Sequence, residues 1–206
     1  MKILVTITII AVMTMATLYM TAGTVESNEQ TVVSKWTDKY DGCFKSAVAD
    51  HWPPGMRGQW QLLKAQCITE SHLRTGLTSS AGAEGICQIL PSTFEEVERK
   101  VNLRQLGRRS PCRNIEAAAA YMNRLMRIWR GRPRSKSCLV ENAWCCYNAG
   151  CGNCIKAQAI GGDGLCWDQI APYLHQVTGV KHSAETLAYI QRTWRHWREI
   201  KGYELE

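Results

Sequence analysis

All ten cysteines of this 206-residue chain lie between Cys43 and Cys166. That number is too high for an ordinary cytosolic protein, in which thiols are kept reduced, so it indicates an oxidising compartment and several disulfides. The pairing cannot be read from the sequence, because ten cysteines allow hundreds of connectivities. We therefore expect one domain of usual size whose core is stapled by disulfides.

One group of cysteines has a second interpretation. Cys145, Cys146, Cys151 and Cys154 include a Cys-x-x-Cys step, which also occurs in zinc sites. A second well-spaced pair of this kind is missing, and the adjacent Cys145 and Cys146 would point about 100° apart on a helix. Disulfides are the better prediction, and we expect neither a metal nor a cofactor.

The N-terminus has the pattern of an export segment. Met1 and Lys2 precede a charge-free stretch from Ile3 to Gly23, with an apolar middle and small residues at its end. Its length approaches that of a membrane span, so a cleaved signal peptide and a signal anchor both stay open for residues 1–23, and we favour cleavage. Residues 24–54 would form an N-terminal extension with a packing helix near Thr31 to Asp50, and residues 55–206 the main domain. We expect this domain in the periplasm or outside the cell, with the inner membrane holding any uncleaved anchor.

A carboxylate ends the apolar face of a predicted helix. In residues 57–69 the spacing of Trp60, Leu63 and Cys67 places them on one helical face, and Glu70 continues that face. A carboxyl group at such a position is partly desolvated, which raises its pKa toward that of a general acid at neutral pH. Such an acid suits cleavage of a glycosidic bond.

The residues after Glu70 predict a tight turn followed by a new helix. Gly82 and Gly85 permit positive φ angles and a close backbone approach. Gln88 is the one polar residue in the apolar run from Ile86 to Leu90, so its amide needs partners in protein, water or substrate, and it suits an acetamido sugar. Ser92 and Thr93 then stand three residues before Glu95 and Glu96, the capping-box spacing that starts a helix.

These residues resemble the motifs of the soluble lytic transglycosylase family, which cleaves peptidoglycan. The first motif comprises Glu70-Ser71, Ser79, Gly82-Ala83, Gly85, Gln88, Pro91 and Thr93. Two more follow in the family's order, at Tyr147-Asn148-Ala149-Gly150 and at Glu185-Thr186 with Tyr189. The resemblance covers roughly residues 55 to 195 and implies a lysozyme-like, mainly α-helical domain with a short turn or hairpin element. It implies Glu70 as the acid and base, and a sugar groove lined by Ser79, Gln88, Tyr147, Asn148, Glu185 and Tyr189.

Some of these residues also have a purely structural interpretation. Tyr147 and Tyr189 have the character of core aromatics with a polar tip. Ser183 is a candidate N-cap of a last helix reaching Ile200, and Glu185 would then complement the helix dipole in its first turn. Asn114 is in the same way a candidate N-cap, for a helix whose apolar face continues through Leu125 and Ile128.

The number of carboxylates bears on the reaction. Ordinary glycosidases use two, whereas no aspartate occurs between Asp50 and Asp163. This favours the route that the resemblance implies, in which one glutamate protonates the leaving oxygen and then deprotonates the substrate's C6 hydroxyl, so that a 1,6-anhydro-muramic acid forms. Two alternatives stay open: a goose-type-like muramidase with Glu84, Glu95 or Asp163 as its base, and a wall-binding scaffold that has lost catalysis.

The formal charge of +7 favours anionic partners. Nucleic acid is one candidate, but the sequence has no zinc-finger, RRM or helix-turn-helix signature. Peptidoglycan, with its peptide carboxylates, is anionic and lies where an exported protein would meet it. We expect a monomer that acts on glycan strands, with membrane contact only through the N-terminal segment. Phage lysis, wall remodelling and wall opening for a secretion or conjugation machine all stay open, and the small basic domain favours lysis.

Overall fold

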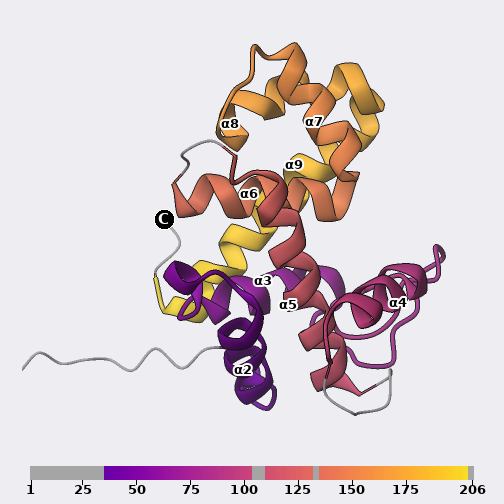
Figure 1. Ribbon diagram of the computed structural model, residues 1–206, viewed down its shortest axis with the longest axis vertical. Helices are drawn as coiled ribbons and strands as arrows, with labels where there is room; N and C mark the ends of the chain where they lie inside the picture. The colour runs from indigo at the N-terminus through magenta and orange to yellow at the C-terminus, as the bar shows by residue number, and fades with distance from the viewer. Residues whose placement is uncertain (1–34, 104–109, 132–134, 204–206) are drawn as a thin grey trace, which may run out of the picture. The chain divides into compact units, whose positions relative to one another are not determined.

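The computed structural model describes residues 35–103, 110–131 and 135–203, and nearly all regular structure in these ranges is helical. The elements, in chain order, are α2 (Asp41–His51), the 3-10 turn η1 (Pro54–Met56), α3 (Trp60–Ser71), α4 (Pro91–Lys100), α5 (Pro111–Ile128), α6 (Lys136–Ala149), α7 (Cys151–Ile160), α8 (Trp167–Ile170), the 3-10 turn η2 (Ala171–Tyr173) and α9 (Leu174–Lys201) (Figure 1). The predicted mainly helical class is confirmed.

The predicted export segment, residues 1–23, and the linker after it lie outside the described residues. Within the three described ranges, no helix combines the length and the apolar character that crossing a membrane requires.

Helix α5 provides the central packing surface of the domain. Four consecutive alanines, 117–120, are buried there, and their small side chains let neighbouring helices approach closely. Helices α2, α3, α4 and α6 all contact α5. Around it, large side chains fill the core: Phe44, Trp52, Leu63, Ile68, Ile86, Met122, Leu125, Trp129 and Trp144. Each such side chain contributes about 1.5–3 kcal/mol through burial of apolar surface.

Helix α3 packs along α9, and this pairing forms the base of the site described below. The hydroxyls of Thr69 and Thr193 meet across it at 3.0 Å. Helix α6 passes directly into α7 through Gly150, whose φ of 85° lies in the region that glycine adopts most readily. Helices α7 and α8 pack together with η2 at one end of α9, drawn in orange and yellow in Figure 1.

All ten cysteines are paired, so the predicted disulfides are confirmed. The pairs are Cys43–Cys112, Cys67–Cys87, Cys138–Cys166, Cys145–Cys154 and Cys146–Cys151. The last two pairs join α6 to α7, and they use the four cysteines for which a zinc site was the second interpretation. Since each of these sulfurs is bonded to another cysteine, none remains as a thiolate ligand.

Two helices begin earlier than their expected caps. Helix α4 starts at Pro91 and α5 at Pro111, and the residues just before them, Leu90 and Ser110, make no side-chain capping bond. Proline suits the first helical position because its fixed φ is already helical and no N–H is needed there. The capping box predicted at Ser92 and Thr93 is therefore wrong, and so is the cap predicted at Asn114, which lies inside α5.

The last helix is longer than predicted, and the first is shorter. Helix α9 runs over Leu174–Lys201 with a break at Gly179, whose φ of 80° and ψ of 163° are not helical. Ser183 is consequently an internal, buried residue rather than an N-cap, and its hydroxyl donates to the Val180 carbonyl. Helix α2 begins at Asp41, after the non-helical residues 35–40, and it contributes Phe44 to the core. The start predicted near Thr31 lies outside the described residues. The domain boundary at residue 55 stays a prediction.

Candidate active site

Glu70 lies in the last turn of α3, where the chain leaves the helix. His72 adopts a left-handed conformation with φ of 54°, and its N–H closes the helix on the Ile68 carbonyl. The Glu70 side chain is half-buried and faces α9. There the Tyr189 hydroxyl donates a hydrogen bond of 2.6 Å to Glu70 Oε1. The structure thus brings together two residues separated by more than a hundred positions in the sequence.

The environment of Glu70 shifts its ionisation to neutral pH. Burial raises the pKa of its carboxyl group to about 7, against the lowering effects of the Tyr189 hydrogen bond and the Arg192 charge. Desolvation is the largest of the three effects, because removing a carboxylate from water disfavours its charged form. Near neutral pH the group therefore exists in comparable amounts as acid and as base, which is the condition a general acid and base needs.

Tyr147 faces the same carboxylate from α6. Its hydroxyl donates to the Cys87 carbonyl at 2.7 Å. Burial, and then the nearby negative charge of Glu70, hold the pKa of Tyr147 well above its ordinary value, and the same two causes act on Tyr189. Both tyrosines stay protonated and act as hydrogen-bond donors.

The turn after α3 is closed by short antiparallel bridges that join Glu84 to Thr78 and to Ile89. Ser79 Oγ accepts a bond from the Ala83 N–H inside this turn. Gln88 has a positive φ of 49°, and its amide nitrogen donates to the Leu77 and Gly85 carbonyls. Two residues predicted to bind sugar therefore also hold the turn in shape, which the sequence pattern did not reveal.

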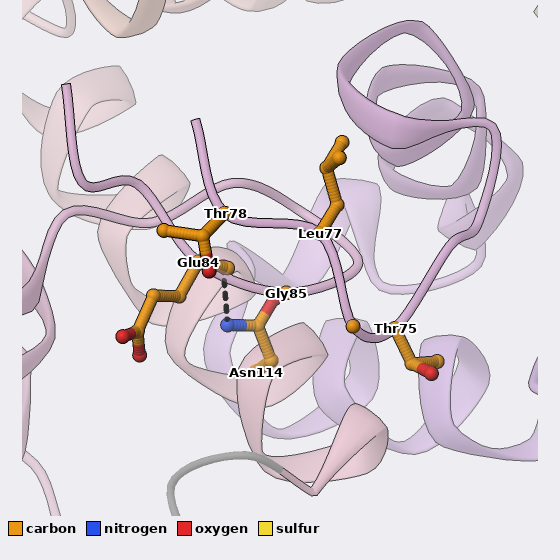
Figure 2. A pocket seen from close by; sticks show the side chains of 7 residues that line it. Thr75, Leu77, Thr78, Glu84, Gly85 and Asn114 are labelled. Carbon is orange, nitrogen blue, oxygen red and sulfur yellow. Dashed lines mark hydrogen bonds between the residues drawn. The ribbon is translucent and has the colours of Figure 1, made fainter. Parts of the chain in front are cut away.

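Asn114 holds this turn in place from α5, a role that the sequence did not indicate. From α5, its Oδ1 accepts from the Cys87 N–H at 2.9 Å and its Nδ2 donates to the Glu84 carbonyl at 3.1 Å (Figure 2). Gly85 lies so close that a Cβ there would be 2.8 Å from Asn114 Nδ2. The proline start of α5 is the signal that places this asparagine inside the helix, and no sequence signal identifies its partners.

A pocket of about 140 Å³ lies beside the turn and is lined by Thr75, Gly76, Leu77, Thr78, Glu84, Gly85 and Asn114. In Figure 2 the Glu84 side chain extends away from the bond between Asn114 and the Glu84 carbonyl. Glu70 does not line this pocket.

The Cys67–Cys87 disulfide ties the catalytic candidate to the turn. Cys67 lies one helical turn before Glu70, and both of its sulfurs are fully buried. Beside it, the Ser71 hydroxyl donates to the Ile86 carbonyl at 2.6 Å. The Cys87 carbonyl also accepts the hydrogen bond from the Tyr147 hydroxyl. Helix α3, the turn and α6 are therefore joined around Glu70.

Asn148 and Glu185 line a second, polar pocket of about 340 Å³, together with Ala149, Asn153, Thr178, His182 and Thr186. The Thr186 hydroxyl donates to Asn148 Oδ1 at 2.8 Å, which joins α6 to α9. Glu185 is exposed, and it lies 3.3 Å from His182 on the same helix. The hydrogen bond to Glu70 comes instead from Tyr189, one turn further along α9 than Glu185.

In the described part of the chain, no three His, Cys, Asp or Glu residues lie close enough together to hold a metal ion. The site therefore combines a carboxyl group with a pKa of about 7, two phenol hydrogen-bond donors, a rigid turn and a polar pocket.

Comparison with known proteins identifies the fold. The family model of the transglycosylase SLT domain matches residues 53–168. The 70 kDa soluble lytic transglycosylase of Escherichia coli is 18% identical, with a TM-score of 0.58 over 80% of this chain and 25% of that one. An inactive glutamate-to-glutamine mutant of the lytic transglycosylase Slt from Pseudomonas aeruginosa is 19% identical, with a TM-score of 0.60 over 81% and 25%. A 70-kDa soluble lytic transglycosylase in complex with bulgecin A is 16% identical, with a TM-score of 0.59 over 80% and 24%.

The chain spans about a quarter of the length of these solved proteins. At this level of identity the likeness shows a shared fold, and it confirms the lysozyme-like helical architecture predicted from the sequence. No curated protein is similar enough in sequence to count as a relative.

Proposed function

Because the chain belongs to the family of transglycosylase SLT domains, we propose that it is a peptidoglycan lytic transglycosylase. It cleaves the β-1,4 bond between N-acetylmuramic acid and N-acetylglucosamine and leaves a 1,6-anhydro-muramic acid. The observation that carries this proposal is the bond between Tyr189 and Glu70, whose carboxyl group has its pKa raised to about 7.

The geometry assigns different tasks to the two oxygens of Glu70. Oε1 accepts the Tyr189 hydroxyl at 2.6 Å, so the transferable proton belongs on Oε2. Protonated Glu70 donates this proton to the glycosidic oxygen as the bond to the leaving sugar breaks. The carboxylate so formed takes the proton from the C6 hydroxyl of muramic acid, whose oxygen closes the anhydro ring at C1. Glu70 thus gives up one proton and regains one, so the reaction needs neither a second carboxylate nor water.

The hydrolytic alternative needs a second carboxylate to activate water. Its candidates are Glu84, Glu95 and Asp163. Glu84 lines a pocket to which Glu70 does not contribute. Glu95 is an exposed residue of α4, and Asp163 is exposed just after α7. These positions favour the transglycosylase over the muramidase. The poised pKa of Glu70 likewise favours an enzyme over a scaffold without activity.

We propose that the glycan strand runs past Glu70 between the turn and α9. Ser79 and Gln88 contact sugar from the turn, with Gln88 offering its carbonyl oxygen because its amide nitrogen is already bonded. Tyr147 and Tyr189 flank the reacting centre. Asn148 and Glu185 bind the strand in the polar pocket between α6 and α9.

The five disulfides support export to an oxidising compartment, the periplasm or the cell exterior, where peptidoglycan lies. We propose that residues 1–23 direct this export and are cleaved, that the enzyme is a monomer, and that it serves in lysis. N-terminal sequencing of the exported protein tests the cleavage, since an intact Met1 would contradict it.

Substitution of Glu70 tests the proposed activity. We expect Glu70→Gln to lower the rate of turbidity loss of purified peptidoglycan by at least about a hundredfold, the usual contribution of a general acid and base. Glutamine has nearly the same shape, so circular dichroism should show an unchanged fold. Glu95→Gln, at an exposed position of α4, is the matched control, and this variant should keep the activity of the unmodified protein. A folded Glu70→Gln protein with near-normal activity would refute the assignment.

A further inference from the structure

A buried glutamine one helical turn before Glu70 has no task in the proposed mechanism. Gln66 lies on α3 four residues before Glu70, so the two side chains leave the same face of that helix. The Gln66 side chain is fully buried. Such an amide needs partners for an acceptor oxygen and for two N–H donors, and a native protein rarely leaves these groups without a reason.

One neighbour fixes the direction in which the Gln66 amide points. Trp144 Nε1 of α6 donates to Gln66 Oε1 at 3.1 Å. An indole N–H can only donate, so the amide must turn its oxygen, and not its nitrogen, toward Trp144. The Trp144 ring is itself fully buried and packs edge-on against Trp194, with 5.1 Å between the ring centres. The amide nitrogen consequently points away from Trp144.

The group that this nitrogen approaches is the tyrosine bonded to Glu70. The nitrogen is buried, and within the described part of the chain it makes no hydrogen bond of ordinary geometry. Burial and then Glu70 raise the pKa of Tyr189, whereas hydrogen bonding by the Gln66 side chain acts in the opposite direction. A lowering effect means that Gln66 presents a donor to the phenol oxygen across the contact of α3 with α9.

The Tyr189 hydroxyl thereby acquires a direction. Its one hydrogen goes to Glu70 Oε1 at 2.6 Å, so its oxygen is the acceptor for Gln66. Every N–H and O–H from Trp144 to Tyr189 then points toward the catalytic carboxyl group, and bonds aligned in this way strengthen one another. Without the Gln66 donor, the phenol oxygen is free to accept the hydrogen of protonated Glu70, and that bond would retain the proton that the glycosidic oxygen needs.

We propose that Gln66 is a positioning residue of the reaction, which keeps the Tyr189 hydroxyl as a donor to Glu70 Oε1 and so keeps the transferable proton on Oε2. The inference rests on the proposed function, because it assigns Gln66 to the proton transfer at Glu70. Since the Gln66 side chain is fully buried, it does not touch the substrate. It acts through Tyr189, on the chemical step rather than on binding.

Substitution of Gln66 by methionine tests this assignment. Methionine fills a similar space but has no N–H donor, so α3 stays packed while the donor to Tyr189 is lost. The bond that stabilises the Glu70 carboxylate is then weaker, and the pKa of Glu70 rises above about 7. The charged and titratable groups that act on Glu70 keep their charges: Tyr189 and Arg192 of α9 and Tyr147 of α6.

We expect Gln66→Met to lower kcat by about fivefold, as the loss of one ordinary hydrogen bond implies, and to leave KM unchanged. The alkaline limb of the pH profile of kcat should move to higher pH, because Glu70 stays protonated over a wider range. Leu63→Met, at a buried position of the same helix, is the matched control for core packing and should keep both kcat and the profile.

The same substitution in a Tyr189→Phe background separates positioning from packing. Without the phenol hydroxyl Gln66 has nothing to orient, so Gln66→Met should leave the kcat and the pH profile of Tyr189→Phe where they were. If it lowers kcat as much in this background as in the unmodified protein, Gln66 acts by packing and the inference is wrong.

The pKa of Glu70 is also measurable without substrate, by carbon-13 NMR titration of its carboxyl carbon. An unchanged pKa in folded Gln66→Met would overturn the inference. If this variant does not fold, Trp144→Phe takes its place: the amide oxygen loses its donor, the nitrogen is no longer held toward Tyr189, and the pKa of Glu70 should again rise. An unmodified protein that cleaves no peptidoglycan would refute the proposed function, whereas the titration would still show whether Gln66 governs the proton of Glu70.

Discussion

At the scale of single residues, the pKa of Glu70 results from two opposing influences. Burial at the end of α3 raises it, whereas the Tyr189 hydroxyl and the Arg192 charge lower it, and the balance lies at about 7. Tyr189 is thus more than a residue of the groove wall. Its bond to Oε1 stabilises the carboxylate and fixes the position of the carboxyl group.

Removal of this hydroxyl gives a prediction with a definite sign. In Tyr189→Phe the burial of Glu70 remains and a bond that lowers its pKa is lost, so the pKa rises above about 7. Glu70 must be protonated to act as the acid, and the alkaline limb of the pH profile of kcat should therefore move to higher pH. We also expect kcat to fall about tenfold, as the loss of a bond to a charged group implies.

The measurement is kcat on soluble glycan strands from pH 5 to pH 9. Tyr203→Phe, at an exposed position near the end of α9, is the matched control and should follow the unmodified profile. An alkaline limb that stays in place, or that moves to lower pH, would show that the Tyr189 bond does not govern Glu70.

Single residues were predictable from sequence where a motif marks them. Glu70 and Tyr189 both stand in recognisable motifs, and apolar spacing alone indicated that Glu70 is partly desolvated. Asn114 was predicted as a helix cap because it precedes an apolar helical pattern. Its bonds to Cys87 and Glu84 depend on which segment packs over α5. That packing is set by tertiary structure, which no local pattern of residues contains.

At the scale of elements, α3 and the turn after it function as one unit through the Cys67–Cys87 bridge. Its loop spans 20 residues, whereas the Cys43–Cys112 bridge between α2 and α5 spans 69. In the chain-entropy description a bridge that closes a longer loop stabilises more, within a typical range of about 2–4 kcal/mol. We therefore expect the Cys43–Cys112 bridge to contribute more to stability, and the Cys67–Cys87 bridge to contribute more to the position of Glu70.

Removing each bridge separately should dissociate the two effects. We expect the double substitution of Cys43 and Cys112 by alanine to lower the free energy of unfolding by about 2–4 kcal/mol and to leave kcat near normal in the folded protein. The same change at Cys67 and Cys87 should lower kcat by about tenfold or more at a temperature where the protein is still folded, because a small displacement of a catalytic group is costly.

Urea unfolding and kcat per folded molecule measure the two quantities. Equal kcat values in the two double variants would mean that the Cys67–Cys87 bridge serves stability alone.

The helices themselves were predicted better than their ends. The sequence indicated helices that contain Trp60, Leu125 and Trp194, and all three residues lie in helices. The starts of α4 and α5 were placed too late because serine, threonine and asparagine were preferred as caps over the prolines that begin these helices. In α9 the break at Gly179 lies within one long helix, and the sequence indicated only the part from Ser183 onward.

At the scale of the whole molecule, the fold class was predictable because three motifs in order and ten cysteines restrict the alternatives. The disulfide pairing was not, since it depends on which helices become neighbours. Adjacent Cys145 and Cys146 illustrate this: both pair with α7, to Cys154 and Cys151 respectively, because Gly150 folds α7 back against α6. The same folding forms one wall of the polar pocket that holds Asn148.

In the proposed reaction one carboxyl group completes the cleavage without water, and the products show whether it does. Purified peptidoglycan is digested, and the muropeptides are examined by mass spectrometry before and after borohydride treatment. We expect most fragments to end in 1,6-anhydro-N-acetylmuramic acid, lighter by one water than the hydrolytic product and unchanged by borohydride, because they have no reducing end. If most fragments instead take up the hydrogens of reduction, water is the nucleophile, the transglycosylase proposal is wrong, and Glu84 and Glu95 become the first candidates for the base of a muramidase.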